Sequence, residues 1–133
     1  MIIVDSSVWV DYFNGEGTPE VNYLDSVLAI QPVAIGDLIL AEVLQGFRRE
    51  RDYVVAKDLL LELTIFAMLG QERAIRVAEN YRSLRRRGIT IRKTSDVIIA
   101  TFCIEAGIAL LFSDNDFLPF VRQLGLVPAL PST

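Results

Sequence analysis

The chain has 133 residues, a length typical of one domain, and 52% of them are hydrophobic, which is enough to bury a core without cross-links. Its 17 acidic and 13 basic residues give a net charge of −4, and it contains one cysteine and no histidine. The lack of histidine excludes a Ser-His-Asp triad, a Cys-His pair, an HExxH zinc site and histidine-based ribonuclease chemistry. One cysteine excludes an intrachain disulfide.

The predicted elements alternate between strands and helices. In chain order they are a strand over 1–5, helices over 6–14 and 19–29, a strand over 33–36, helices over 37–50 and 50–62, a strand over 64–69, helices over 71–87 and 94–107, a strand over 109–114, a helix over 114–125 and an edge segment over 126–130. The apolar runs break long before about 18 residues, so no membrane span is predicted. The chain opens on strand-like MIIVD rather than on a leader. A single cysteine, which can form no intrachain disulfide, fits a reducing compartment, so we expect a cytoplasmic protein.

Capping residues and spacing refine these helices. Thr18, Asp37 and Thr94 are predicted to cap the helices that follow them, and Gly88 is predicted to end the helix over 71–87. In that helix an apolar stripe is predicted opposite three arginines; the stripe is Ala74, Ile75, Ala78, Tyr81 and Leu84, and the arginines are Arg73, Arg76 and Arg87. The alternation predicts a single three-layer α/β/α domain over 1–133 with a mainly parallel central sheet.

Acidic residues stand where predicted strands end and helices begin. Asp5 and Asp114 end the first and last strands, and Asp96 lies in the first turn of the helix over 94–107. In an open parallel sheet these positions face one crevice. Glu42 lies in a helix that is otherwise apolar around it, and Asp116 follows Asp114 by two residues.

Each acid also has a simpler interpretation. Asp5, Asp96 and Asp114 could serve as caps or first-turn residues. Glu42 could belong to a thin solvent stripe with Gln45 and Arg49. Several like charges gathered in one crevice are unfavourable unless a cation neutralises them. Mg²⁺ or Mn²⁺ fits a site made only of oxygen ligands. The sequence therefore predicts a divalent-metal site at this edge of the sheet.

Four stretches, IIVDSSVWVDYF, LAEVLQGF, SDVIIATFCIEAG and LLFSDNDF, resemble in their order and spacing a PIN-domain ribonuclease, in particular the VapC toxins of toxin–antitoxin pairs. The resemblance covers the whole chain. It implies an acidic quartet at Asp5, Glu42, Asp96 and Asp114, with Asp116 as an auxiliary acid and Ser6 and Ser113 as supporting hydroxyls.

The resemblance implies a Mg²⁺- or Mn²⁺-dependent endoribonuclease that leaves 5′-phosphate and 3′-hydroxyl ends. It also implies a homodimer and an antitoxin whose tail packs into a groove; the candidate groove residues are Val21, Leu24, Leu28 and the apolar positions of 53–63. The high apolar content independently predicts a partner surface. Two other classes remain open: a catalytically silent PIN-like binding module, and a receiver-type phosphoacceptor domain. The receiver is disfavoured because neither lysine, Lys57 or Lys93, ends a late strand.

Eight basic residues and one acid lie between Arg73 and Lys93, whereas the first 47 residues hold seven acids and no Lys or Arg. The segment YRSLRRRGITIRK is either a solvated helix end that complements the helix dipole or a rim that grips RNA phosphates. Under the second interpretation Arg85, Arg86 and Arg87 contact the RNA.

Overall fold

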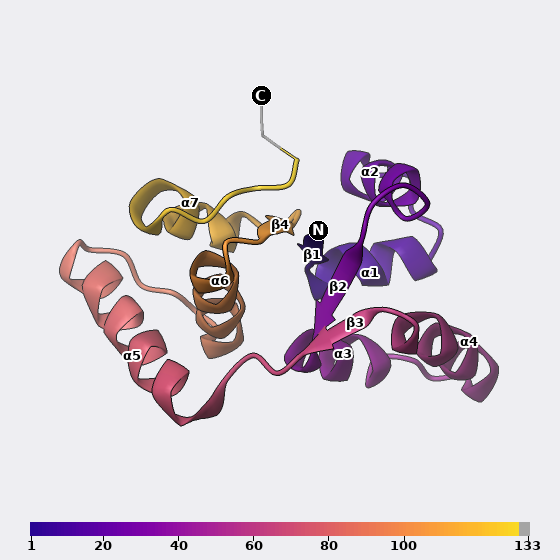
Figure 1. Ribbon diagram of the computed structural model, residues 1–133, viewed down its shortest axis with the longest axis horizontal. Helices are drawn as coiled ribbons and strands as arrows, with labels where there is room; N and C mark the ends of the chain where they lie inside the picture. Colours follow the sequence, from indigo (N-terminus) through magenta and orange to yellow (C-terminus); the bar gives the residue numbers. More distant parts are fainter. Residues whose placement is uncertain (131–133) are drawn as a thin grey trace.

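The computed structural model describes residues 1–130, which form one four-stranded sheet flanked by helices (Figure 1). The elements in chain order are β1 (Ile2–Val4), α1 (Ser6–Phe13), α2 (Pro19–Val27), β2 (Val33–Gly36), α3 (Asp37–Leu44), α4 (Glu50–Leu61), β3 (Thr64–Phe66), α5 (Gly70–Arg86), α6 (Thr94–Ala106), β4 (Ala109–Leu111), the 3₁₀ helix η1 (Asn115–Phe117) and α7 (Leu118–Leu124).

The strand order is β3-β2-β1-β4, and every pairing is parallel. All residues of β1 and β2 are buried, as expected of parallel strands covered on both faces. In Figure 1, α1, α2, α3 and α4 gather on one side of the strands, and α5, α6 and α7 on the other. The prediction of a three-layer α/β/α fold with a parallel sheet is therefore confirmed.

The strand order also determines where a site can form. The chain moves from β1 outward through β2 to β3 and then returns to place β4 on the other side of β1. Connections on either side of β1 therefore run in opposite directions, and the carboxyl ends of β1 and β4 border a crevice of the kind that holds ligands in such sheets.

Several predicted boundaries needed correction. Asp37 is the first residue of α3 rather than its cap, because Gly36 holds the extended cap conformation; the Asp37 carboxylate instead accepts hydrogen bonds from the N–H groups of Leu38 and Met68, at 2.8 and 3.1 Å. Thr94 is likewise the first residue of α6, which starts after the extended Lys93 and has no side-chain cap. The helix predicted over 37–50 ends at Leu44, and the strands predicted over 64–69 and 109–114 are three residues long.

Other predicted ends were confirmed. The Thr18 hydroxyl accepts a hydrogen bond from the N–H of Val21 at 3.1 Å. Gly88 lies two residues after the end of α5, beyond the capping Arg87, and has a φ of +82°; the N–H of Ile89 donates to the carbonyl of Leu84 at 2.9 Å. That bond pattern is the Schellman motif, which requires a left-handed residue and so favours glycine. The final segment forms an isolated parallel bridge between Pro128 and Leu110 of β4.

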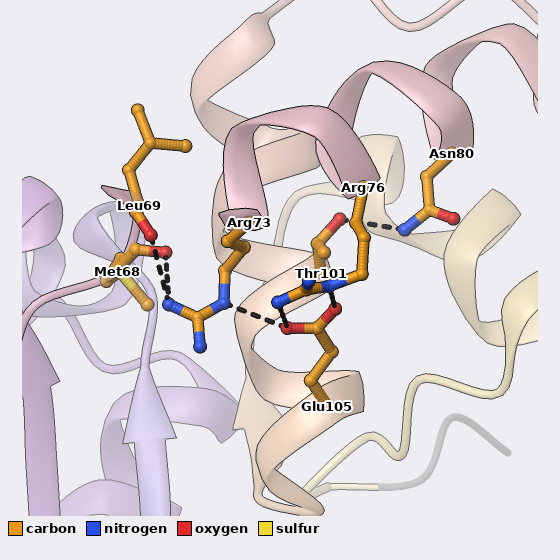
Figure 2. A network of polar contacts seen from close by, with 7 residues as sticks. All are labelled: Met68, Leu69, Arg73, Arg76, Asn80, Thr101 and Glu105. Atoms are coloured by element: carbon orange, nitrogen blue, oxygen red, sulfur yellow. Dashed lines mark hydrogen bonds and ion pairs between the residues drawn. The ribbon is translucent and has the colours of Figure 1, made fainter. Parts of the chain in front are cut away.

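The predicted faces of α5 were partly wrong. Ile75 is 57% exposed, whereas Arg73 lies inward against α6. Figure 2 shows the guanidinium of Arg73 between the carbonyls of Met68 and Leu69 and the carboxylate of Glu105. Arg76 also donates to Glu105, and Asn80 donates to the buried hydroxyl of Thr101 at 2.9 Å. These polar contacts fasten α5 to α6, the helix that carries Asp96.

Within residues 1–130, no helix combines the length and the apolar character needed to cross a bilayer.

Candidate metal centre

The ends of β1 and β4 are joined at the crevice. The N–H of Asp5 donates to the carbonyl of Leu111, the last residue of β4, at 2.9 Å. Asp5 is the residue directly after β1, and Asp114 lies three residues after the end of β4. β1 and β4 pair directly and in parallel, which is the condition for Asp5 and Asp114 to border the same crevice.

Asp5 is a buried carboxylate held by local hydrogen bonds. It is 4% exposed and caps α1, and its Oδ2 accepts hydrogen bonds from the hydroxyl and the N–H of Ser7, at 2.8 and 3.4 Å. Burial raises the pKa of Asp5 and the charge of Asp114 adds to this, while the hydrogen bonds from Ser7 and the Ser6 backbone oppose it. The capping role and the site role thus coexist in one side chain.

Three acids meet at the start of α6 and the end of β4. One carboxylate oxygen from each of Asp96, Asp114 and Asp116 lies within 4.8 Å of the other two, and we call these residues the three-acid cluster. Asp114 also caps η1, since its Oδ1 accepts a hydrogen bond from the N–H of Asp116 at 2.9 Å.

Asp96 carries the clearest sign of an unneutralised charge. It is 6% exposed, and no hydrogen bond from residues 1–130 reaches its buried Oδ2. Burial, and next the charge of Asp5, raise the pKa of Asp96 to about 7, with smaller contributions from Asp114 and Asp116. A carboxylate in this position costs free energy unless a cation binds it.

Glu42 approaches from α3. It is half-buried, and its Oε1 is the second buried carboxylate oxygen that receives no hydrogen bond from the described residues. Burial first and the charge of Asp5 second raise the pKa of Glu42. This burial argues against the solvent-stripe interpretation of Glu42.

The five acids do not all lie within one cluster. Asp5 and Glu42 lie outside the three-acid cluster of the described chain, but the charge of Asp5 raises the pKa values of both Glu42 and Asp96. The donor set consists of carboxylates alone, and two of its oxygens, on Asp96 and Glu42, are buried without a partner. Hard cations that prefer oxygen ligands, such as Mg²⁺ and Mn²⁺, fit this arrangement.

The supporting hydroxyls differ in part from those expected. Ser113 takes part, since its Oγ lies 3.3 Å from the Oγ of Ser7. Ser7, which the sequence analysis missed, is the hydroxyl that binds Asp5, and its position two residues after a capping Asp is the signal that could have identified it. The side chains of Ser6 and Ser95 face Glu42, another acid of the predicted quartet, and lower its pKa.

Two cationic side chains next to the acids were not predicted from the sequence either. Arg92 donates from Nη2 to Oδ2 of Asp116 at 2.7 Å, and the charge of Lys93 lowers the pKa values of Glu42 and Asp96. Both residues directly precede α6, so their nearness to Asp96 in the sequence was a signal that cations lie close to it, although not of the contact with Asp116.

The arginines predicted to contact RNA are all exposed. Arg87 donates to the backbone and side-chain oxygens of Gln123, at 3.3 and 3.0 Å, and so helps to fasten α7. Arg85 stacks on Tyr81, with 5.5 Å from its guanidinium carbon to the ring centre.

Comparisons with known proteins agree with this architecture. The model of the PIN domain matches residues 2–120. The chain is 32% identical to the VapC ribonuclease Mb1587 of Mycobacterium bovis over 97% of this chain and 98% of that protein. The fold is similar to VapBC2 from Rickettsia felis bound to a DNA fragment from its promoter (TM-score 0.75, 21% identity, 96% of this chain and 97% of that chain).

A second solved structure, the sarcin-ricin loop cleaving toxin VapC20 of Mycobacterium tuberculosis, has a TM-score of 0.68 at 21% identity and covers 98% of this chain and 100% of its own. At this identity the two structural likenesses concern the fold alone. The family match and the 32% identical relative go further, because both extend over the elements that carry the five acids. This chain is therefore a member of the PIN-domain family.

Proposed function

We propose that this chain is a divalent-metal-dependent endoribonuclease and the toxin of a toxin–antitoxin pair. Its membership of the PIN-domain family and its similarity to a VapC ribonuclease support this assignment. The observation that carries it is the three-acid cluster beside two buried carboxylate oxygens that receive no hydrogen bond from residues 1–130.

In this proposal Asp5, Asp96 and Asp114 hold the cation, with Glu42 and Asp116 as further ligands. Mg²⁺ and Mn²⁺ are the proposed ions. A divalent ion in such a site lowers the pKa of water and polarises a phosphoryl oxygen of the substrate. That chemistry needs no histidine, in agreement with the composition.

The protein's own groups position the reaction. The hydrogen bonds from Ser7 favour the ionised form of Asp5 and so oppose the effect of its burial, which raises its pKa. Asp96 lies in the first turn of α6, where the helix dipole favours a negative charge. Glu42, whose pKa is raised, is suited to orient the attacking water and to accept its proton. Attack by an external water leaves a 5′-phosphate and a 3′-hydroxyl.

A candidate surface for a protein partner must consist of residues that are not buried in the core. Val21 and Leu24 are 8% and 0% exposed and so belong to the core rather than to a groove. A depression of about 540 Å³ beside α4 combines Phe13, Phe47 and Val55 with three arginines, Arg48, Arg49 and Arg51. We propose that the antitoxin occupies this depression and that the toxin is a homodimer.

Analysis of the reaction products tests the proposal. The purified chain is incubated with RNA and Mg²⁺ or Mn²⁺, and the ends of the fragments are identified. The expected result is cleavage that chelator stops, with 5′-phosphate ends that allow ligation. A silent binding module would bind its partner and yield no fragments under any metal. Fragments ending in a 2′,3′-cyclic phosphate would contradict attack by an external water.

A further inference from the structure

Arg92 reaches the candidate metal centre from the loop before α6. Its Nη2 donates to Oδ2 of Asp116 at 2.7 Å, and Asp116 is one member of the three-acid cluster. The Arg92 side chain is 74% exposed, while that of Asp116 is 25% exposed. The guanidinium is therefore fixed at one edge to the rim of the crevice and open to solvent elsewhere.

We expect this ion pair to contribute little to the stability of the fold. Exposed pairs contribute little to stability in general, because water and salt screen them. A guanidinium carries five N–H donors, and only one of them binds an acceptor among residues 1–130. The remaining donors form the planar fork that matches a phosphate group.

The surrounding charge explains why such a group is needed. Five acids lie in or beside the crevice, and an RNA phosphate must approach them against their repulsion. Lys93 adds a second cation, whose charge lowers the pKa values of both Glu42 and Asp96. Its backbone is extended (φ −122°, ψ 124°), a conformation in which neighbouring side chains point to opposite sides. Arg92, which contacts Asp116, is thus the cation with a defined position at the acids, and Lys93 adds a second positive charge.

We propose that Arg92 binds a phosphate of the RNA at the candidate metal centre, and that Asp116 positions its guanidinium for this purpose. The inference rests on the proposed endoribonuclease function and adds to it a substrate-binding residue. It also gives Asp116 a second role, since a carboxylate with two oxygens can face the cluster and Arg92 together.

Steady-state cleavage by three variants tests the proposal. Arg92→Ala removes the guanidinium, Arg92→Lys keeps the charge without the fork, and Arg122→Ala removes an exposed arginine of α7 for which no ion pair is found among residues 1–130. Loss of a charge-assisted hydrogen bond predicts that Arg92→Ala lowers kcat/KM by about tenfold to hundredfold. Arg92→Lys should recover part of the loss, and Arg122→Ala should match the unmodified chain.

Calorimetric titration with Mn²⁺ separates substrate binding from a structural role. Arg92→Ala should bind Mn²⁺ no more weakly than the unmodified chain, because it removes a competing cation from Asp116. Unchanged kcat/KM in Arg92→Ala, or a loss of Mn²⁺ affinity that parallels the loss of cleavage, would overturn the role of Arg92. Absence of cleavage by the unmodified chain would instead refute the proposed function itself.

Discussion

The hydroxyl oxygens of Ser7 and Ser113 lie 3.3 Å apart, although 106 residues separate them in the chain. Ser7 is the second residue of α1, just after β1, and Ser113 follows β4, so this contact spans the junction of the two strand ends. Ser7 also donates its hydroxyl to Asp5 at 2.8 Å. The hydroxyl of Ser7 therefore contacts both Asp5, whose ionised form it favours, and the segment that follows β4.

The first prediction concerns Ser7→Ala. The Ser7 hydrogen bond lowers the pKa of Asp5, so its loss should raise that pKa further and weaken metal binding most at low pH. A hydrogen bond to a charged group contributes about 1.5 kcal/mol, which corresponds to roughly tenfold in Mn²⁺ affinity near pH 6 and less near pH 8. Calorimetric titration at the two pH values measures the difference. Ser113→Ala, which removes no donor from Asp5, is the control and should show a smaller effect; equal effects in both variants would contradict the role of Ser7.

The second prediction concerns pH and the metal-free protein. The ordinary pKa of an Asp carboxyl is 3.8, and in the folded chain that of Asp96 is about 7. Between these values the unfolded chain has released the Asp96 proton while the folded chain retains it. The free energy of unfolding should therefore fall as pH rises through this window, with a contribution from Asp96 below the one-proton limit of about 1.4 kcal/mol per pH unit. Excess Mn²⁺, which binds the ionised form, should reduce or reverse the fall.

Asp96→Asn tests the assignment of this pH dependence. The variant lacks the titrating group, so its stability should depend less on pH, and at pH 8 without metal it should unfold at a higher temperature than the unmodified chain. It should also lose the stabilisation by Mn²⁺. Thermal unfolding across pH 4–8 measures both effects. If the stability of the variant depended on pH as steeply as that of the unmodified chain, groups other than Asp96 would cause the pH dependence.

The third prediction concerns the contact between α5 and α6. Arg73 donates to two carbonyls and to Glu105 and stacks on Phe102 at 4.8 Å, whereas Arg76 binds Glu105 alone among the described residues (Figure 2). Arg73→Ala should therefore cost about 1–2 kcal/mol of unfolding free energy, because it leaves the Met68 carbonyl without this donor. Arg76→Ala is the matched control and should cost clearly less. Denaturant titration compares the two, and equal losses would show that the carbonyl contacts of Arg73 contribute nothing.

The fourth prediction concerns the exposed arginines at the end of α5. If Arg85 and Arg86 contact RNA phosphates, replacing both with Ala should weaken RNA binding and reduce the slope of log affinity against log salt by about one for each contact. Lys57→Ala, which removes a positive charge from α4, is the control and should leave the slope unchanged. RNA affinities measured at several salt concentrations, with cleavage blocked by Asp96→Asn, provide the test. An unaltered slope in the double variant would make these arginines solvated charges only.

The sequence predicted the elements well because their causes are local. Apolar runs without alternation identified β1 and β2, and the left-handed Gly88 marked the end of α5. The positions of Asp5 and Asp114 at strand ends could also be predicted, because the carboxyl ends of parallel strands meet at one edge of a sheet. What failed depends on tertiary contacts: Arg73 was predicted to face solvent, but the carbonyls before α5 and Glu105 on α6 provide its partners.

The surroundings of the acids were the least predictable part. Arg92 pairs with Asp116 across the loop before α6, and spacing alone does not reveal that contact. Ser6 was predicted to support the acidic quartet without a specified partner; in the fold it faces Glu42, and Ser7, which was not singled out, binds Asp5. Successive residues in the first turn of a helix point in different directions, so a shift by one residue changes which acid a serine contacts. The packing of the helix determines that direction, and the sequence does not show it.

Calorimetric titration with Mn²⁺ tests most directly whether the acids at the ends of β1 and β4 and the start of α6 form one cation site. The unmodified chain should bind Mn²⁺, and Asp25→Asn, a change at an exposed acid of α2, should bind it equally well. Asp5→Asn, Asp96→Asn and Asp114→Asn should each weaken binding by about tenfold or more while the chain stays folded, because each removes a charged ligand. Mn²⁺ binding of equal strength in all of these variants would contradict the account.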